Sequence, residues 1–115
     1  MKDFYKINNF KTMITIERYK DYEHRLGVQI QKISIKPSED GWFDVYCELH
    51  AINGGEIDCS IDVQCVAYGK DGSILSMISD FISDDEFFGF EVLEFAFQVD
   101  GMYNNVETIK VFPKK

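Results

Sequence analysis

The sequence is poor in the residues that usually build catalytic and metal sites. It has two histidines and three cysteines, and none of them falls into a Cys-x-x-Cys or His-Glu-x-x-His spacing. Those spacings matter because they bring metal ligands together on one side of the chain. The Asn53-Gly54-Gly55 turn also lacks the strand-to-helix context of a phosphate-binding loop. We therefore expect a protein that is not an enzyme and that uses no metal or other cofactor.

Long apolar runs and prolines are scarce too. The first ten residues contain no apolar segment of the length of a signal peptide, and no later window is long enough to span a membrane. This predicts a cytoplasmic protein without membrane contact, unless a secretion signal precedes the sequence in its precursor. Two prolines and the lack of a low-complexity run argue against long disordered tails.

Acidic and basic residues are unevenly distributed in a chain whose net charge is -8. Residues 1–36 contain eight Lys or Arg and four acidic residues, whereas residues 37–109 contain sixteen acidic residues and one basic residue, Lys70. A negative surface attracts a basic partner over about 8 Å at physiological salt, and it repels nucleic acid. The alternative is that the carboxylates are solvated on outward strand positions and pair with the basic N-terminal segment.

Alternation is the clearest pattern that the sequence does contain. Apolar and small side chains recur at every second position from Ile57 to Ala67, with polar ones between them. Because strand side chains alternate between two faces, this predicts a strand over Ile57–Tyr68 with one buried face. Glycine turns flank the strand, which indicates a β-hairpin or a β-arch. Cys59 and Cys65 fall on the inner face, which favours reduced buried thiols, although a Cys47–Cys65 disulfide is the alternative in an oxidising compartment.

The same test predicts six further strands, over residues 12–17, 26–36, 43–51, 74–82, 93–99 and 106–112. Inward positions change parity between Ile30 and Ile33, which indicates a bulge or a switch between sheets. Residues 74–82 are apolar on both parities, which is typical of an edge or crossover strand. Residues 18–25 are polar and fit either a loop or one short helix. At 115 residues and 15% aromatics, the chain is long enough for a single two-layer domain.

We therefore expect an all-β fold, a two-sheet antiparallel immunoglobulin-like sandwich of about seven strands. Residues 1–25 are expected to form an N-terminal extension or an extra strand. The two sheets would bury their Phe and Ile faces against each other.

The order of motifs resembles that of bacterial FxLYD-type and related immunoglobulin-like domains. The resemblance covers about residues 26–112 and lies in a strand ending in Asn53-Gly54-Gly55, a strand ending in Cys65-Val66-Ala67-Tyr68, the Lys70-Asp71-Gly72 turn and a late Phe-rich strand. It implies a fibronectin III-like sandwich that acts as an accessory or binding module without catalysis. Gly69 and Ala67 depart from the pattern of those domains, and the family is mostly extracytoplasmic.

Two groups of residues contain the side-chain types of a nucleophilic site and of a calcium site. Cys47, Glu48 and His50 could supply a nucleophile, an acid and a base, but Cys47 and His50 have opposite parity and are expected to point to opposite faces. Asp80, Asp84, Asp85 and Glu86 form an acidic loop that could hold calcium, but the Asp-x-Asp-x-Asp-Gly spacing is missing. A solvated acidic loop is the preferred interpretation.

Aromatic residues give two candidate binding surfaces. Phe87, Phe88 and Phe90 surround Gly89 and cannot all face one core, so at least one is expected to be an exposed protein-contact anchor, or else Phe87 caps the end of the sandwich. Trp42, Tyr46 and Tyr68 are expected on outward strand positions among acidic residues, where they would either contact a basic peptide, a protein or a sugar, or only stabilise the sheet as a cross-strand pair.

Two functional hypotheses follow, and both involve a protein partner. The first is a non-catalytic immunoglobulin-like binding or accessory module. The second is a small acidic inhibitor or immunity protein that mimics nucleic acid and binds a basic toxin or nuclease. A homodimer through the edge strand at residues 74–82 is an additional expectation, because open edges pair with identical strands.

Overall fold

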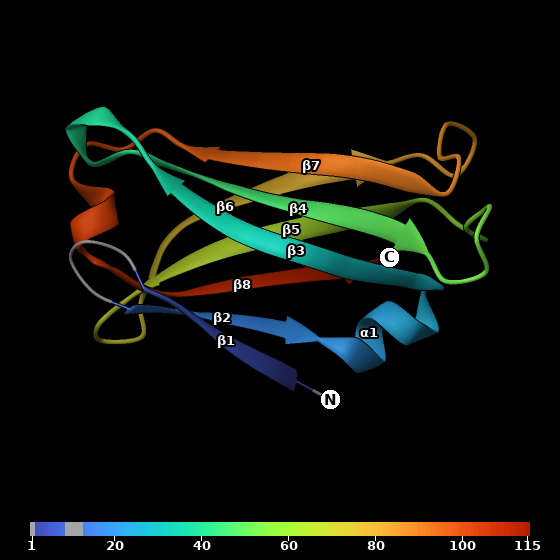
Figure 1. The fold of residues 1–115 in the computed structure, drawn as a ribbon, viewed down its shortest axis with the longest axis horizontal. Helices are drawn as coiled ribbons and strands as arrows, with labels where there is room; N and C mark the ends of the chain where they lie inside the picture. The colour runs from blue at the N-terminus through green and yellow to red at the C-terminus, as the bar shows by residue number, and fades with distance from the viewer. Residues whose placement is uncertain (1, 9–12) are drawn as a thin grey trace.

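The computed structural model describes residues 2–8 and 13–115, with side chains from residue 14 onward, as two stacked β-sheets (Figure 1). The larger sheet has the order β1 (Lys2–Asn8), β2 (Met13–Tyr19), β8 (Val106–Lys114), β5 (Ile61–Gly69) and β6 (Ile74–Ile82). The smaller sheet has the order β3 (Val28–Pro37), β4 (Phe43–Ala51) and β7 (Phe90–Phe97). The expected all-β sandwich is confirmed, and residues 2–19 add a pair of strands to it.

Within residues 2–8 and 13–115, three short helices connect the strands: α1 (Lys20–Arg25), η1 (Glu39–Gly41) and η2 (Met102–Asn104). The polar segment over residues 18–25 therefore contains one short helix. No helix in the described part of the chain is long and apolar enough to cross a membrane.

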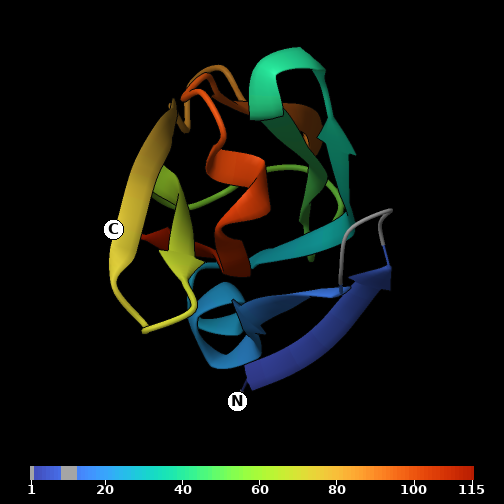
Figure 2. The same cartoon turned by 90° about the vertical axis from the view of Figure 1, so that its left-hand side faces the viewer.

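The strand order can be compared with that of immunoglobulin domains. Strands β3, β4 and β7 lie together in one sheet, as A, B and E do there, and β5, β6 and β8 lie in the other, as C, C′ and F do. The position beside F, which strand G occupies in immunoglobulin domains, is taken by β2, which runs parallel to β8. Figure 2 shows β1 (dark blue) and β6 (yellow) at the two opposite edges of the larger sheet. Strand β2 thus extends the larger sheet beyond β8, at the position where strand G lies in immunoglobulin domains.

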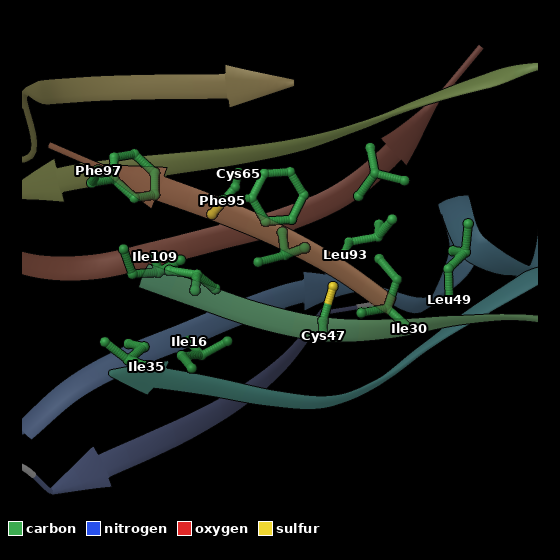
Figure 3. Packing of buried hydrophobic residues seen from close by; sticks show 14 of the residues in the cluster. Ile16, Ile30, Ile35, Cys47, Leu49, Cys65, Leu93, Phe95, Phe97 and Ile109 are labelled. Carbon is green, nitrogen blue, oxygen red and sulfur yellow. The ribbon is translucent and has the colours of Figure 1, made fainter. Parts of the chain in front are cut away.

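The core forms where the alternating apolar faces of the two sheets meet. Side chains such as Ile16, Cys65 and Ile109 from the larger sheet pack against Cys47 and Phe95 from the smaller one (Figure 3). All positions of β4 expected to face inward are buried, namely Phe43, Val45, Cys47, Leu49 and Ala51. Burial of such side chains is the main stabilising contribution to a sandwich of this size.

The predicted irregularity in the 26–36 segment is a β-bulge in β3. The β3–β4 register shifts between Gln31 and Ser34, and Lys32 between them has a left-handed φ of 54°. The bulge lets Ile30 and Ile35, which differ in parity, both face the core. The strand therefore stays in one sheet and does not switch.

The predicted strand over Ile57–Tyr68 is correct only in its second part. β5 begins at Ile61, and β4 and β5 belong to different sheets, so the connection is a β-arch and not a hairpin. Ile57 is nevertheless buried, because the loop turns it into the core. Just before the strand, the Ser60 hydroxyl donates to Asp84 Oδ1 (2.8 Å) and accepts from the Asp84 backbone N–H (3.1 Å). These bonds tie the arch to the β6–β7 loop.

Two other predicted boundaries shift. The late Phe-rich strand spans Phe90–Phe97 rather than 93–99, and Val99 lies exposed in the following loop. That loop packs tightly against the turn after β3: Gly101 N–H donates to Asp40 O (2.8 Å), and a Cβ at Gly41 would lie 2.5 Å from the Gly101 Cα. Gly41 is therefore required by contact as well as by its φ of 76°.

Candidate functional site

The three outward aromatic residues do not form one surface. Tyr46 lies on the smaller sheet and Trp42 lies just before its strand β4, not on a strand position as expected, whereas Tyr68 lies on the outer face of the larger sheet. The expectation that Tyr68 extends the surface of Tyr46 is wrong, because it assumed that β4 and β5 are neighbours in one sheet.

Each of these aromatic residues has partners within the fold. The Trp42 indole N–H donates to Asp100 Oδ1 (2.7 Å), and the Tyr46 hydroxyl donates to Glu94 Oε2 (3.0 Å) across the β4–β7 pair. The hydrogen bond to the Glu94 carboxylate raises the pKa of Tyr46. The Lys110 ammonium lies 4.6 Å from the Tyr68 ring centroid. These contacts support the alternative interpretation, in which the residues stabilise their sheets.

The Cys47, Glu48 and His50 set does not assemble into a nucleophilic site. Cys47 is buried in the core, whereas His50 lies on the outer face with its Nε2 2.9 Å from Glu48 Oε1. Burial raises the pKa of Cys47 to about 12 and that of Cys65 well above its ordinary value. All three cysteines are free. A buried, protonated thiol facing away from the imidazole is a poor nucleophile.

The acidic loop is only partly free for binding. Asp84 is held by Ser60, whereas Asp85 and Glu86 are exposed. Among the side chains that the structure describes, no three His, Cys, Asp or Glu groups converge in a way that could hold a metal ion.

The three phenylalanines after that loop divide between core and surface. Phe87 is 1% exposed and caps the core, whereas Phe88 is 85% exposed and Phe90 is 50% exposed. Gly89 separates them with a φ of 98°, and a Cβ there would lie 2.9 Å from the Gly54 carbonyl oxygen. Phe87 is therefore the expected cap, and Phe88 and Phe90 have the expected exposure, while a role in protein contact stays a prediction.

Strand β6 is an edge strand in the described sheet, as one of the sequence alternatives has it. It pairs with β5 on one side, and no described strand lies on its other side. Its outward row consists of Leu75, Met77, Ser79 and Phe81, all exposed and uncharged, with Met77 at 55% and Phe81 at 65%. Ile78 faces inward and packs against the core. An edge of nine residues with exposed apolar side chains is suited to pairing with another strand.

Carboxylates line the open side between the edge strands β6 and β7. Asp80 lies opposite buried Val63, and Glu91 lies opposite buried Leu49, so both are on inward-facing positions. Burial, followed by the charges of Asp80 and Glu86, raises the pKa of Glu91. We call Asp80, Glu86 and Glu91 the acidic seam. None of the three carboxylates has a hydrogen bond or ion pair with any residue that the structure describes.

Two features of the fold were missed by the sequence analysis. One is a buried ion pair between Arg18 and Glu23, whose residues were placed in a loop or a solvated helix. The other is a pocket of about 240 Å³, lined by Tyr22, Arg25, Leu26, Pro113, Lys114 and Lys115. The basic residues at both ends of the chain were the available signal, but only the fold brings them together.

Comparison with protein-family models, curated proteins and solved structures finds no match to this chain.

Proposed function

We propose that this protein is a non-catalytic, immunoglobulin-like binding module that pairs with an extended segment of a protein partner along the open edge of β6. The observation that carries the proposal is the uncharged, exposed row of Leu75, Met77 and Phe81 on a strand with one open edge in the described sheet. In strand addition, backbone hydrogen bonds supply affinity, and alternate side chains supply specificity.

Charge indicates the kind of partner. The acidic seam lies beside the β6 edge, and no described cation neutralises it. A partner strand that carries Lys or Arg at positions facing the seam would gain charge complementarity, whereas an acidic strand would be repelled. The partner is therefore a basic segment in extended conformation.

A single substitution tests the edge. Met77→Lys places a charge in the outward row without touching the core, and Val99→Lys is a matched control at an exposed aliphatic residue outside any strand. We expect basic proteins captured from the native lysate by the wild type and by Val99→Lys to be lost with Met77→Lys. The β6 amides should also gain protection from hydrogen exchange when the purified partner is added. Equal capture by both variants would exclude the edge as the binding site.

The acidic inhibitor is the second candidate function, and the acidic seam is the observation that favours it. Binding of a toxin or nuclease by carboxylates alone would weaken steeply as salt is added, whereas strand addition with apolar contacts would persist. Measuring the affinity of a captured partner at low and high salt separates the two candidates. The resemblance to FxLYD-type domains stays a prediction, and neither candidate depends on it.

A further inference from the structure

One end of the sandwich carries two features of opposite charge. The strands β6 and β8 and the helix α1 all finish at this end, so the β6–β7 loop and the C-terminal residues lie there together (Figure 1, right-hand side). One feature is the basic pocket found beside α1, and the other is the acidic loop that carries Phe88.

The pocket is apolar at its base and cationic at its margin. Tyr22, Leu26 and Pro113 supply the apolar lining, and the Arg25 guanidinium lies over the Tyr22 ring at 5.3 Å from the centroid. Lys114 and Lys115 complete the lining, which includes no acidic side chain. Such a pocket suits an aromatic group flanked by carboxylates.

The β6–β7 loop presents such a group. Phe88 is the most exposed of the large hydrophobic residues in the described part of the chain, and it directly follows the acidic run Asp84-Asp85-Glu86 and the buried Phe87. The loop is fixed on both sides of Phe88. Phe87 is anchored in the core, and the Ala51 N–H donates to the Gly89 carbonyl (3.0 Å). An exposed aromatic held in this way costs little entropy when it binds.

The two features belong to one continuous end surface. The turn that follows β4 lies between them: Ile52 N–H donates to the Gly27 carbonyl just after α1 (2.9 Å), and Gly54 contacts Gly89. Exposed Ile52 and half-buried Leu26 line a second, smaller pocket on the same surface. That pocket is also lined by His24, Asn53, Glu56 and Asp58, so the end surface is mixed apolar and acidic along its middle, positive on the α1 side and negative on the β6–β7 side.

We propose that this end is a self-association surface on which two copies pair about a two-fold axis, with Phe88 of each copy inserted into the Tyr22–Arg25–Lys114 pocket of the other. A two-fold contact requires a self-complementary surface, and here one chain carries both the aromatic group and its pocket. The pocket volume of about 240 Å³ exceeds the roughly 150 Å³ that accommodates a benzene ring. Asp85 and Glu86 of one copy then face the cations of the other.

This surface shares Glu86 with the acidic seam, but it does not include the edge strand β6 itself. Met77 lies on the outer face of the larger sheet, whereas Phe88 lies in the loop beyond the end of β6. Pairing through the end leaves the β6 edge of each copy open to its partner strand, so either inference can fail without the other.

Sedimentation equilibrium of the full chain at low salt tests the pairing. Phe88→Ser should weaken dimerisation about 30-fold or more, because central aromatic anchors dominate such interfaces. Phe81→Ser removes another exposed aromatic, one on the outer face of β6, and is the matched control. We expect it to leave the dimer unchanged. Both side chains are exposed, so both variants should unfold at the wild-type temperature.

A mixing experiment tests the reciprocal geometry. Arg25→Glu damages the pocket and Phe88→Ser removes the inserted group, so each variant alone loses both contacts of the dimer. A mixture regains one intact contact, between Phe88 of the first variant and the pocket of the second, and should associate more tightly than either variant alone. A wild type that is monomeric at all concentrations overturns the proposal. So does a dimer that survives Phe88→Ser, or a mixture that associates no better than its components.

Discussion

Arg18 of β2 and Glu23 of α1 form a buried, two-contact ion pair that closes the sandwich between its two sheets. Arg18 Nε donates to Glu23 Oε2 (2.9 Å), and a second guanidinium nitrogen donates to Oε1. Glu23 Oε1 also accepts the backbone N–H of Ile30 on β3 (3.0 Å). One carboxylate thus joins β2 of the larger sheet to β3, an edge strand of the smaller one.

Removing one partner of this pair should be costly. Glu23→Ala removes the carboxylate that the buried guanidinium contacts and the acceptor of the Ile30 N–H, and we expect a loss of about 3–5 kcal/mol in the free energy of unfolding. The double variant Arg18→Met/Glu23→Leu should recover much of that loss, since apolar replacements of similar volume remove the buried guanidinium together with the carboxylate. Urea unfolding measures both. Equal losses in the single and double variants would show that the charge pair is not what matters.

The two neighbouring positions of the β6 edge should respond differently to the same change. Met77 faces outward and Ile78 packs against the core. We expect Met77→Lys to abolish any pairing of two copies through residues 74–82 while the fold stays stable. Ile78→Lys should instead lower the urea midpoint, because it brings a charge toward the core. Sedimentation measures the oligomeric state of both variants, and urea unfolding measures their stability. An unchanged oligomeric state with Met77→Lys removes this edge as a self-association site.

The acidic seam should make stability depend on pH. The pKa of Glu91 is raised in the folded state, so its contribution to stability is greatest below its unfolded pKa and is lost as pH rises through the folded value. Glu91→Gln mimics the protonated form and should raise the melting temperature at neutral pH, with little effect in acid. Glu107→Gln, at an exposed position, is the control. If Glu91→Gln has the melting temperature of the wild type at neutral pH, Glu91 is not a source of the pH dependence.

The cysteines should differ in reactivity. The pKa of Cys47 is about 12 and that of Cys65 is also well above its ordinary value, both because of burial, so these thiols stay protonated at mildly alkaline pH. Cys59 is half-buried. We expect a thiol reagent to modify Cys59 alone in the folded protein and all three cysteines after denaturation. The raised pKa values of Cys47 and Cys65 also predict that the stability of the fold declines as pH rises above the unfolded thiol pKa of about 8.5. Rapid labelling of Cys47 without unfolding would contradict the prediction that only Cys59 reacts in the folded protein.

Alternation predicted the strands well because each strand has one face in the core. Side chains that face the core recur at every second position, so the burial of one face appears directly in the sequence as alternating apolar residues. It also predicted the β3 bulge, since Ile30 and Ile33 change parity along the sequence. The pattern failed at Ile57, because a loop residue can be buried without belonging to a ladder. It could not assign strands to sheets, which is why Tyr68 was grouped with Trp42 and Tyr46.

The candidate surfaces depended more on tertiary structure. Apolar residues on both parities of 74–82 fit the edge strand that is observed, because one row is partly buried and the other is exposed. The Arg18–Glu23 pair was missed, since charged residues five positions apart in a polar segment look solvated. Nothing local indicates that Tyr22 and Lys114 line one pocket, because 92 positions separate them in the sequence.

The parallel contact between β2 and β8 makes the first and last parts of the chain neighbours. During synthesis, Ile14 and Ile16 of β2 leave the ribosome long before Val106–Lys114, the strand that pairs with β2. The larger sheet therefore cannot be completed until Val106–Lys114 has emerged, and contacts of such sequence separation form slowly. Until then β2 exposes apolar side chains, so a chaperone that holds extended apolar segments would have a long opportunity to bind there.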